Sequence, residues 1–110
     1  MPAAFVLRRA TNGQLHFNLT AANNKNILSS ETYRNKSGAL AGIKSVQANC
    51  GADAHYDRRT SAKGQANLVL LVANKEVIGR SELYSSTSSM ERGIASVKRN
   101  GRKAGVRDET

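Results

Sequence analysis

The sequence predicts an α+β fold in which two tandem copies of one module build a single, largely antiparallel sheet with two helices packed on one face. Three observations predict this fold. Residues 5–50 align with residues 56–101 at a constant offset of 51 without a gap, and 16 of the 46 aligned pairs are identical. Each copy contains a stretch with the alternation of a strand, and each then continues into a stretch with the periodicity of a helix.

A three-stranded meander is expected at the start of each copy. In the first copy, residues 15–21 alternate apolar and polar side chains, which is the pattern of a strand with one buried face. Gly13 precedes this strand and the turn-forming residues 23–26 follow it, so strands are expected on both sides. We place these flanking strands at residues 5–10 and 26–30.

A helix is expected after each meander. In the second copy, Met90, Ile94 and Val97 have the spacing of one helix face, and a run of serines and threonines before them supplies N-cap candidates. The first copy repeats this pattern. Gly42 and Gly93 lie on the apolar face, and a glycine inside a helix costs about 1 kcal/mol relative to alanine. Their presence in both copies therefore predicts that each helix lies very close to the sheet.

The two copies are expected to form one domain over residues 1–110. A module of this size is usually too small to bury a sufficient core alone, and two repeats are too few for a solenoid. We therefore predict a pseudo-two-fold pair made of repeat 1 (about residues 3–52) and repeat 2 (about residues 54–108). Residues 51–56 and 103–109 follow the two helices and are candidates for additional strands.

A paired signature carries a resemblance to a known family. The pattern A-N-x-x-x-I-x-x-S-E-x-Y, followed by G-I-x-S-V-x-x-N, occurs at residues 22–33 with 42–49 and again at residues 73–84 with 93–100. With a Gly-Gln pair ahead of each central strand, it resembles the YegP-like family, small bacterial proteins with a domain of unknown function, over nearly the whole chain. The resemblance implies tandem β-β-β-α-β repeats with C-terminal strands exchanged between the halves, and dimers of single-module members. The resemblance implies no activity, no cofactor and no catalytic residue for this chain.

The composition and the N-terminus predict a cytoplasmic protein without a membrane partner. No apolar run approaches the length of a membrane span, and residues 1–9 lack the apolar segment of a signal peptide. Cys50 is the only cysteine, which excludes an intramolecular disulfide and fits a reducing compartment. Because Cys50 comes at the expected end of a helix, away from the helix N-terminus that would lower its pKa, we expect an inert thiol.

The sequence carries no recognisable enzyme motif. His16 and His55 are the only histidines, they do not occupy equivalent positions, and neither has the spacing of a metal-binding motif. The acidic residues are few and scattered, and no phosphate-binding glycine motif or nucleophile elbow is present. We therefore predict a non-enzymatic interaction or structural module without a cofactor or metal. An enzyme with unrecognised chemistry is the third hypothesis.

The second hypothesis is weak, sequence-independent binding of nucleic acid. The net charge of +9 favours polyanions. The densest basic stretch leaves the second helix and comprises Lys98, Arg99, Arg102, Lys103 and Arg107. Cations at the C-terminus of a helix also complement its dipole, and the interleaved aromatic residues that stack on single-stranded bases are missing. The stretch therefore predicts weak contact with phosphates at most.

A surface for an unknown protein partner or for self-association is expected on the central strand of the second copy. Val69 and Leu71 are apolar where the first copy has Asn18 and Thr20. In a two-layer fold this face meets water, and exposed apolar area usually marks an interaction surface. The alternative is a central strand whose outer side is shielded by long neighbouring side chains.

Most polar residues that occur in both copies have a structural explanation as turn residues, helix caps or ring anchors. These pairs are Arg8 and Arg59, Asn23 and Asn74, Ser30 and Ser81, Glu31 and Glu82, Tyr33 and Tyr84, and Ser45 and Ser96. Function is therefore expected from residues that the two copies do not share.

Overall fold

The computed structural model describes residues 3–23, 25–72 and 75–110, which form two halves with the same order of elements. The first half contains β1 (Ala4–Arg9), β2 (Leu15–Thr20), β3 (Asn26–Ser30) and α1 (Lys36–Asn49). The second half contains β4 (Tyr56–Thr60), β5 (Ala66–Leu71), β6 (Val77–Arg80), α2 (Thr87–Gly101) and β7 (Gly105–Asp108). A short 3-10 turn, Asp53–His55, joins the halves.

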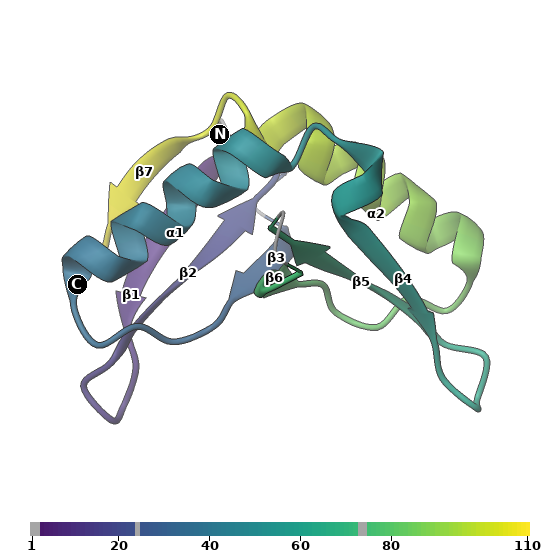
Figure 1. The fold of residues 1–110 in the computed structure, drawn as a ribbon, viewed down its shortest axis with the longest axis horizontal. Coiled ribbons are helices and arrows are strands. Elements are labelled where there is room, and N and C mark those ends of the chain that lie inside the picture. Colours follow the sequence, from purple (N-terminus) through teal and green to yellow (C-terminus); the bar gives the residue numbers. More distant parts are fainter. Residues whose placement is uncertain (1–2, 24, 73–74) are drawn as a thin grey trace.

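The seven strands of the described residues form one sheet in the order β4-β5-β6-β3-β2-β1-β7. Each neighbouring pair is antiparallel except β1 and β7, which run parallel. Both helices lie on the same side of the sheet, which curves beneath them (Figure 1). The predicted α+β fold, with one largely antiparallel sheet and two helices on one face, is confirmed.

The predicted meanders are present, with small shifts at their ends. β1 begins and ends one residue before the predicted strand 5–10, whereas β3 matches its prediction. Gly13 and Gly64, in the turns after β1 and β4, have φ angles of +83° and +81°. Glycine adopts this left-handed backbone without steric cost, which explains why both copies carry a glycine at this point.

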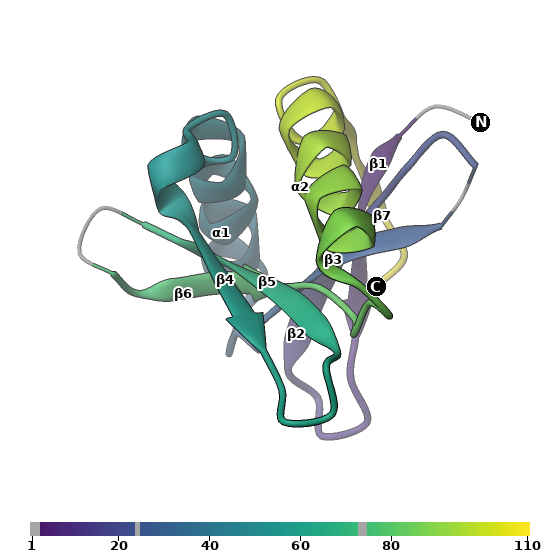
Figure 2. The ribbon, with the colours of Figure 1, turned by 90° about the vertical axis from the view of Figure 1, so that its right-hand side faces the viewer.

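Each helix packs across the boundary between the two halves. α1 contacts β2 of its own half and β6 of the other half, while α2 contacts β5 and β3. Figure 2 shows the two helices side by side on one face of the sheet. A single core results, and its buried members come from both halves, among them Phe5, Phe17, Ile43, Leu68 and Ile94. The buried residues of the two halves therefore belong to one cluster.

A pseudo-two-fold axis passes between β3 and β6 at the centre of the sheet. Ser29 pairs with Arg80, and these residues occupy equivalent positions, 51 apart in the sequence. Equivalent residues can face one another only where they lie beside the axis. Leu28 and Gly79 are the neighbouring equivalent pair, and a Cβ atom on Gly79 would lie 2.9 Å from Cγ of Leu28.

Both helices begin at a side-chain cap within the polar run that the sequence indicates. Asn35 Oδ1 accepts a hydrogen bond from the Gly38 N–H at 2.8 Å, and Ser86 Oγ accepts one from the Ser89 N–H at 3.2 Å. Such caps satisfy backbone donors that the helix itself leaves unpaired. Each helix therefore starts at a residue whose side chain can cap it.

The helix glycines make room for a tyrosine ring. A Cβ atom on Gly42 or Gly93 would lie 2.7 Å from Cζ of Tyr33 or Tyr84, respectively, with the hydroxyl oxygen closer still. Both glycines are tightly packed, but the nearest partner of each is the tyrosine that follows the third strand of its copy, and not a residue of the sheet strands as predicted. For Gly42, a residue of β2 comes next, since the same Cβ atom would lie 3.1 Å from Cε2 of Phe17.

Strand exchange between the halves occurs in one direction only. β7, within the predicted candidate segment 103–109, leaves the second half and pairs with β1 of the first. The corresponding candidate segment 51–56 contains the 3-10 turn and then enters β4 at Tyr56. It therefore adds no separate strand to the sheet, although the family resemblance implies exchange by both halves.

Candidate anion-binding groove

The structure divides the predicted basic stretch into separate places. Lys98 faces β4, where its Nζ lies 2.9 Å from Asp53 Oδ1 and 5.6 Å from the centre of the Tyr56 ring. Arg107 lies in β7, with Nε 2.8 Å from Glu109 Oε2 in an ion pair that lacks the alignment of a hydrogen bond. The remaining members, which are Arg99, Arg102 and Lys103, are exposed and form no ion pair within the described residues.

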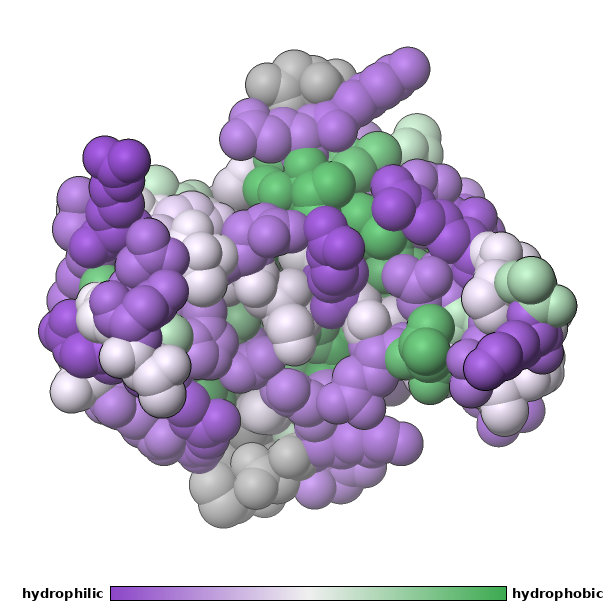
Figure 3. Space-filling view, turned by 90° about the horizontal axis from the view of Figure 1, so that it is seen from below, coloured by the Kyte–Doolittle hydropathy of each residue, from purple (hydrophilic) through white to green (hydrophobic). Residues whose placement is uncertain are grey.

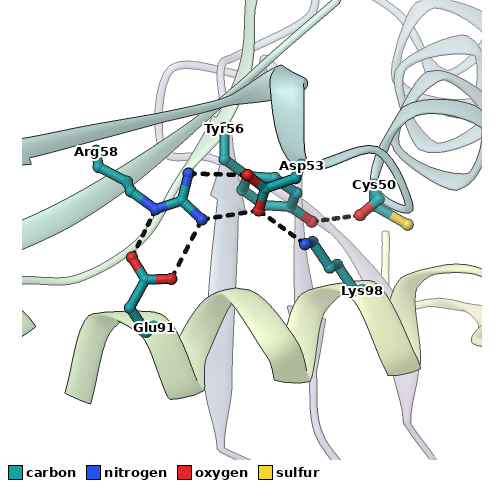
Figure 4. A network of polar contacts seen from close by, with 6 residues as sticks. All are labelled: Cys50, Asp53, Tyr56, Arg58, Glu91 and Lys98. Carbon is teal, nitrogen blue, oxygen red and sulfur yellow. Dashed lines mark hydrogen bonds and ion pairs between the residues drawn. The ribbon is translucent and has the colours of Figure 1, made fainter. Parts of the chain in front are cut away.

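Lys98 belongs to a polar network that ties α2 to β4 and the turn before it (Figure 4). Arg58 Nε lies 2.5 Å from Glu91 Oε2, and Arg58 Nη2 lies 2.8 Å from Asp53 Oδ1. The Tyr56 hydroxyl donates a hydrogen bond of 2.6 Å to the Cys50 carbonyl oxygen, and burial raises the pKa of this phenol. The charged groups of this network pair with one another. The network therefore joins α2 to β4 and the turn before it, and neither of its two carboxylates is left free for catalysis.

Asp53 should make the stability of the protein sensitive to acid. Hydrogen bonds from Arg58 and then Lys98 lower the pKa of its carboxyl group to about 2, against about 3.9 in an unfolded chain. Its contribution is therefore fully present above about pH 5 and is lost as the pH falls towards 2. We expect Asp53→Asn to lower the urea midpoint at pH 6 and to have almost no effect at pH 2. An equal effect at both pH values would show that the carboxylate charge is not involved.

Cys50 is buried beside the axis, at the C-cap of α1. Burial raises the pKa of its thiol, against the opposing effect of Arg102. A Cβ atom on Gly101, its equivalent residue in the other half, would lie 2.8 Å from its Sγ. These surroundings support the expectation of an inert thiol, because the reactive form of cysteine is the thiolate.

A basic groove, which the sequence did not indicate, lies between α2 and the hairpin of β2 and β3. Its larger part has a volume of about 570 Å³. The lining residues come from the hairpin, from the segment before α2 and from one face of α2, and they are Ala21, Asn23, Lys25, Ile27, Leu83, Tyr84, Ser85, Ser89, Arg92, Gly93 and Ser96. A smaller part, of about 320 Å³, shares Ala21, Asn23 and Ser96 with it and extends to Arg99 and Asn100. We call the two parts together the α2 groove.

The α2 groove is positively charged along its length. Lys25, Arg92 and Arg99 line it, and no carboxylate is among its described lining residues. Arg92, Ser96 and Arg99 are spaced so that they share one side of α2. None of the three cations forms an ion pair with another described residue. Their charge is therefore available to a ligand.

Tyr84 lies at the base of the groove against Gly93. Burial raises the pKa of its hydroxyl, and the nearby Glu82 raises it further, so the group is a neutral donor at physiological pH. Ser85, Ser89 and Ser96 add further hydroxyl groups to the walls. Hydroxyl donors together with cations suit an oxyanion such as a phosphate.

The three cations of this groove have no basic counterparts at the equivalent positions of the other half, although Arg34 stands at the position equivalent to Ser85. At the equivalent positions, Glu76 replaces Lys25, Ala41 replaces Arg92, and Ala48 replaces Arg99. The cations of the groove are therefore residues that the copies do not share, whereas other lining residues, such as Tyr84, Gly93 and Ser96, occur in both copies. Lys25 and Arg92 were missed because they belong to different copies and are brought together only by the packing of α2 across the axis.

The prediction that Val69 is exposed is wrong. Val69 is 0% exposed, and Leu71 is half-buried. Val69 lies between Asp57 on β4 and Arg80 on β6. Of these neighbours, Arg80 has the long side chain that the alternative interpretation requires. Figure 3 shows apolar side chains near the middle of this face, ringed by hydrophilic ones. Only the half-buried Leu71 remains from the predicted partner surface.

Two further site classes receive no support from the part of the chain that the structure describes. It contains no cluster of three or more His, Cys, Asp or Glu side chains placed to hold a metal ion. None of its helices is long and apolar enough to cross a membrane.

Comparison with known proteins places the chain among proteins without an assigned activity. The family model described as a domain of unknown function, DUF1508, matches residues 10–57 and again residues 61–108. A UPF0339 protein of Pseudomonas aeruginosa is 44% identical over 110 residues, which cover the whole of both chains. The UPF0339 protein YegP of Escherichia coli is 39% identical, also over the whole of both chains.

Two solved structures share the fold. The solution structure of YegP from Escherichia coli has a TM-score of 0.93 at 39% identity, and the match covers 100% of this chain and 95% of that one. The solution structure of a UPF0339 protein from Shewanella oneidensis has a TM-score of 0.91 at 39% identity, covering 98% and 92%. With two matches to one family model and full-length relatives at this identity, the chain belongs to the DUF1508 family, as a YegP-like protein with two repeats.

Proposed function

We propose that the protein is a non-enzymatic binding module that holds the phosphate backbone of a nucleic acid in the α2 groove. The observation that carries this proposal is the presence of Lys25, Arg92 and Arg99 in one groove that has hydroxyl groups and no carboxylate among its described lining residues. Phosphate contacts of this kind hold a nucleic acid without reading its bases.

The spacing of the two arginines fits a phosphate backbone. Arg92 and Arg99 are seven residues apart on α2, which is about 10 Å along a helix axis. Successive phosphates of one duplex strand are about 3.4 Å apart along the duplex axis. With α2 along the duplex axis, the two arginines span about three phosphates. Lys103 follows the end of α2 at Gly101 and extends the charged surface beside Arg99.

The expected affinity is weak and strongly dependent on salt. Each neutralised phosphate contributes about −0.9 to the slope of log affinity against log salt concentration. Three or four contacts predict a slope of about −3. Dissociation constants for sequence-independent binding of this type are on the order of 1 to 100 μM at physiological salt.

Fluorescence anisotropy with labelled single-stranded and duplex oligonucleotides tests the proposal. The double variant Arg92→Glu with Arg99→Glu should bind at least tenfold more weakly at 50 mM salt, and its slope should be shallower by about 2, since two contacts are lost. The matched control is Lys44→Glu with Lys63→Glu, which changes the net charge equally at exposed positions outside the groove.

Two results would contradict the proposal. The first is no salt-dependent binding by the unmodified protein at 100 μM and low salt. The second is an equal loss of affinity in the groove variant and in the control, which would show that only the overall charge attracts the oligonucleotide.

A further inference from the structure

The two edges of the sheet are unequal. β1 and β4 are equivalent strands, since Phe5 and Tyr56 are 51 residues apart. The outer edge of β1 is covered by β7, whereas β4 ends the sheet with no strand beside it in the described chain. Figure 1 shows these two ends of the sheet on opposite sides of the molecule. At the start of β4, the Tyr56 N–H already donates to the Asp53 carbonyl oxygen. The outer edge of β4 beyond this point can therefore pair with another strand.

The connection between the two halves explains why no strand lies beside β4. Residues 54–57 are the equivalents of β7 in the first half, and the first match to the family model ends at residue 57 just as the second ends at residue 108. In this chain, residues 54–57 run directly into β4, which begins at Tyr56. A segment cannot lie beside a strand of which it is itself the beginning, so the edge of β4 stays open.

We infer that the edge of β4 is a docking site for an extended segment of a partner protein, which adds to the sheet parallel to β4. The segment has an apolar residue, then a basic residue, and an acidic residue two positions after that. Addition of a strand to an open sheet edge is a common way for proteins to bind peptides, with affinity from the backbone and selectivity from the side chains. This inference is independent of the α2 groove.

The contact between β7 and β1 provides the template. Phe5, Val6 and Leu7 pair with Val106, Arg107 and Asp108. The Glu109 N–H then donates to the Leu7 carbonyl oxygen at 2.8 Å, and Arg8 Nε lies 3.2 Å from Glu109 Oε1. The same chain direction and register can be transferred to β4, because the two edges are related by the pseudo-two-fold axis.

Transfer of this register gives the side-chain pattern of the partner. Tyr56 faces the apolar residue, Asp57 faces the basic residue, and Arg59 faces the acidic residue two positions later. Arg59 is the identical equivalent of Arg8, which already binds an acid in this way. Arg58 is engaged by Glu91 and Asp53, so the partner residue opposite it meets no free charge. Complementary charge therefore comes from Asp57 and Arg59.

Asp57 and Arg59 are accessible for this exchange of partners. They form an ion pair with each other at 2.9 Å, and their side chains are 41% and 51% exposed. An exposed ion pair of this kind contributes little to stability, so little is lost when each group turns to a partner charge. The same charges disfavour pairing with uncharged strands at this edge, which makes the site selective.

A labelled peptide with the sequence of residues 103–110, Lys-Ala-Gly-Val-Arg-Asp-Glu-Thr, is the probe. Fluorescence anisotropy should show binding to the full chain, and the amide NMR signals of Tyr56–Thr60 should shift on titration. Arg59→Glu should weaken binding about tenfold, because an attractive cross-strand pair becomes repulsive. A peptide in which lysine replaces the residue corresponding to Glu109 should restore binding to this variant.

Arg8→Glu is the matched control, since it makes the same charge change at the equivalent position on β1. It should not weaken binding. The inference is overturned if the peptide does not bind at 1 mM, if it shifts the signals of β1 because it displaces β7, or if both variants lose affinity equally. A dimer of the unmodified chain that Arg59→Glu abolishes would also overturn it, since a second copy would then be the occupant.

Discussion

Replacement of Gly79 by leucine is expected to lower the free energy of unfolding by about 3 kcal/mol. Gly79 lies on β6 at the centre of the sheet, and a Cβ atom there would already lie 2.9 Å from Cγ of the buried Leu28. Leu28 has no open space to move into, because it packs in the core shared by both helices. Urea unfolding should therefore show a lower midpoint with an unchanged slope.

The pseudo-two-fold axis supplies a rescue of this variant. Leu28 and Gly79 are equivalent positions, so the double variant Leu28→Gly with Gly79→Leu places a leucine from the other half into nearly the same space. Leu28→Gly alone should destabilise the protein by about 2 to 5 kcal/mol through the cavity that it leaves. The double variant should be more stable than either single variant. If the two losses simply add, the residues do not share one space.

The axis is lined by further pairs of one large and one small residue. A Cβ atom on Gly101 would lie 2.8 Å from Sγ of its equivalent, Cys50, and a Cβ atom on Gly51 would lie 3.4 Å from Cδ of its equivalent, Arg102. If either half paired with a copy of itself, each such contact would join two large residues or two small ones. The two halves of this chain have therefore become complementary and are no longer interchangeable.

The elements of the fold are predictable from the sequence because their signals are local. Alternation in residues 15–21, helical spacing around Ile94 and glycines in the turns each depend on a few neighbouring residues. The constant offset of 51 then shows that the halves are alike. It does not show where the axis passes, so the contacts between equivalent residues such as Leu28 and Gly79 become visible only in the structure.

The candidate sites were less predictable because they depend on contacts between the halves. Lys25 and Arg92 are far apart in the sequence and face one groove only because α2 packs on β3 of the other half. Lys98 lies in the densest basic stretch, yet Asp53 binds its charge. Val69 follows the alternation of an exposed position and is nevertheless buried. The places where charged or apolar residues cluster in the sequence therefore did not reveal which side chains are unpaired or exposed in the structure.

Replacement of Gly93 by alanine is expected to lower the free energy of unfolding by about 1 to 2 kcal/mol, although alanine favours a helix by about 1 kcal/mol over glycine. The new methyl group would lie 2.7 Å from Cζ of Tyr84 and closer to its hydroxyl oxygen. The ring must therefore move, and with it the base of the α2 groove. Urea unfolding measures the loss, and the near-ultraviolet circular dichroism of the tyrosines should change in the folded state.

Tyr84→Phe distinguishes this collision from a general intolerance of the helix. Removal of the hydroxyl oxygen takes away the closest atom, so Gly93→Ala should cost less in the Tyr84→Phe background than in the unmodified chain. Gly42→Ala is the matched variant in the other half, where Tyr33 occupies the same position. It should lose comparable stability without weakening oligonucleotide binding, because Gly42 is not among the residues that line the α2 groove. If Gly93→Ala instead stabilises the protein, helix propensity outweighs the contact, and the glycines are not there to admit the tyrosine rings.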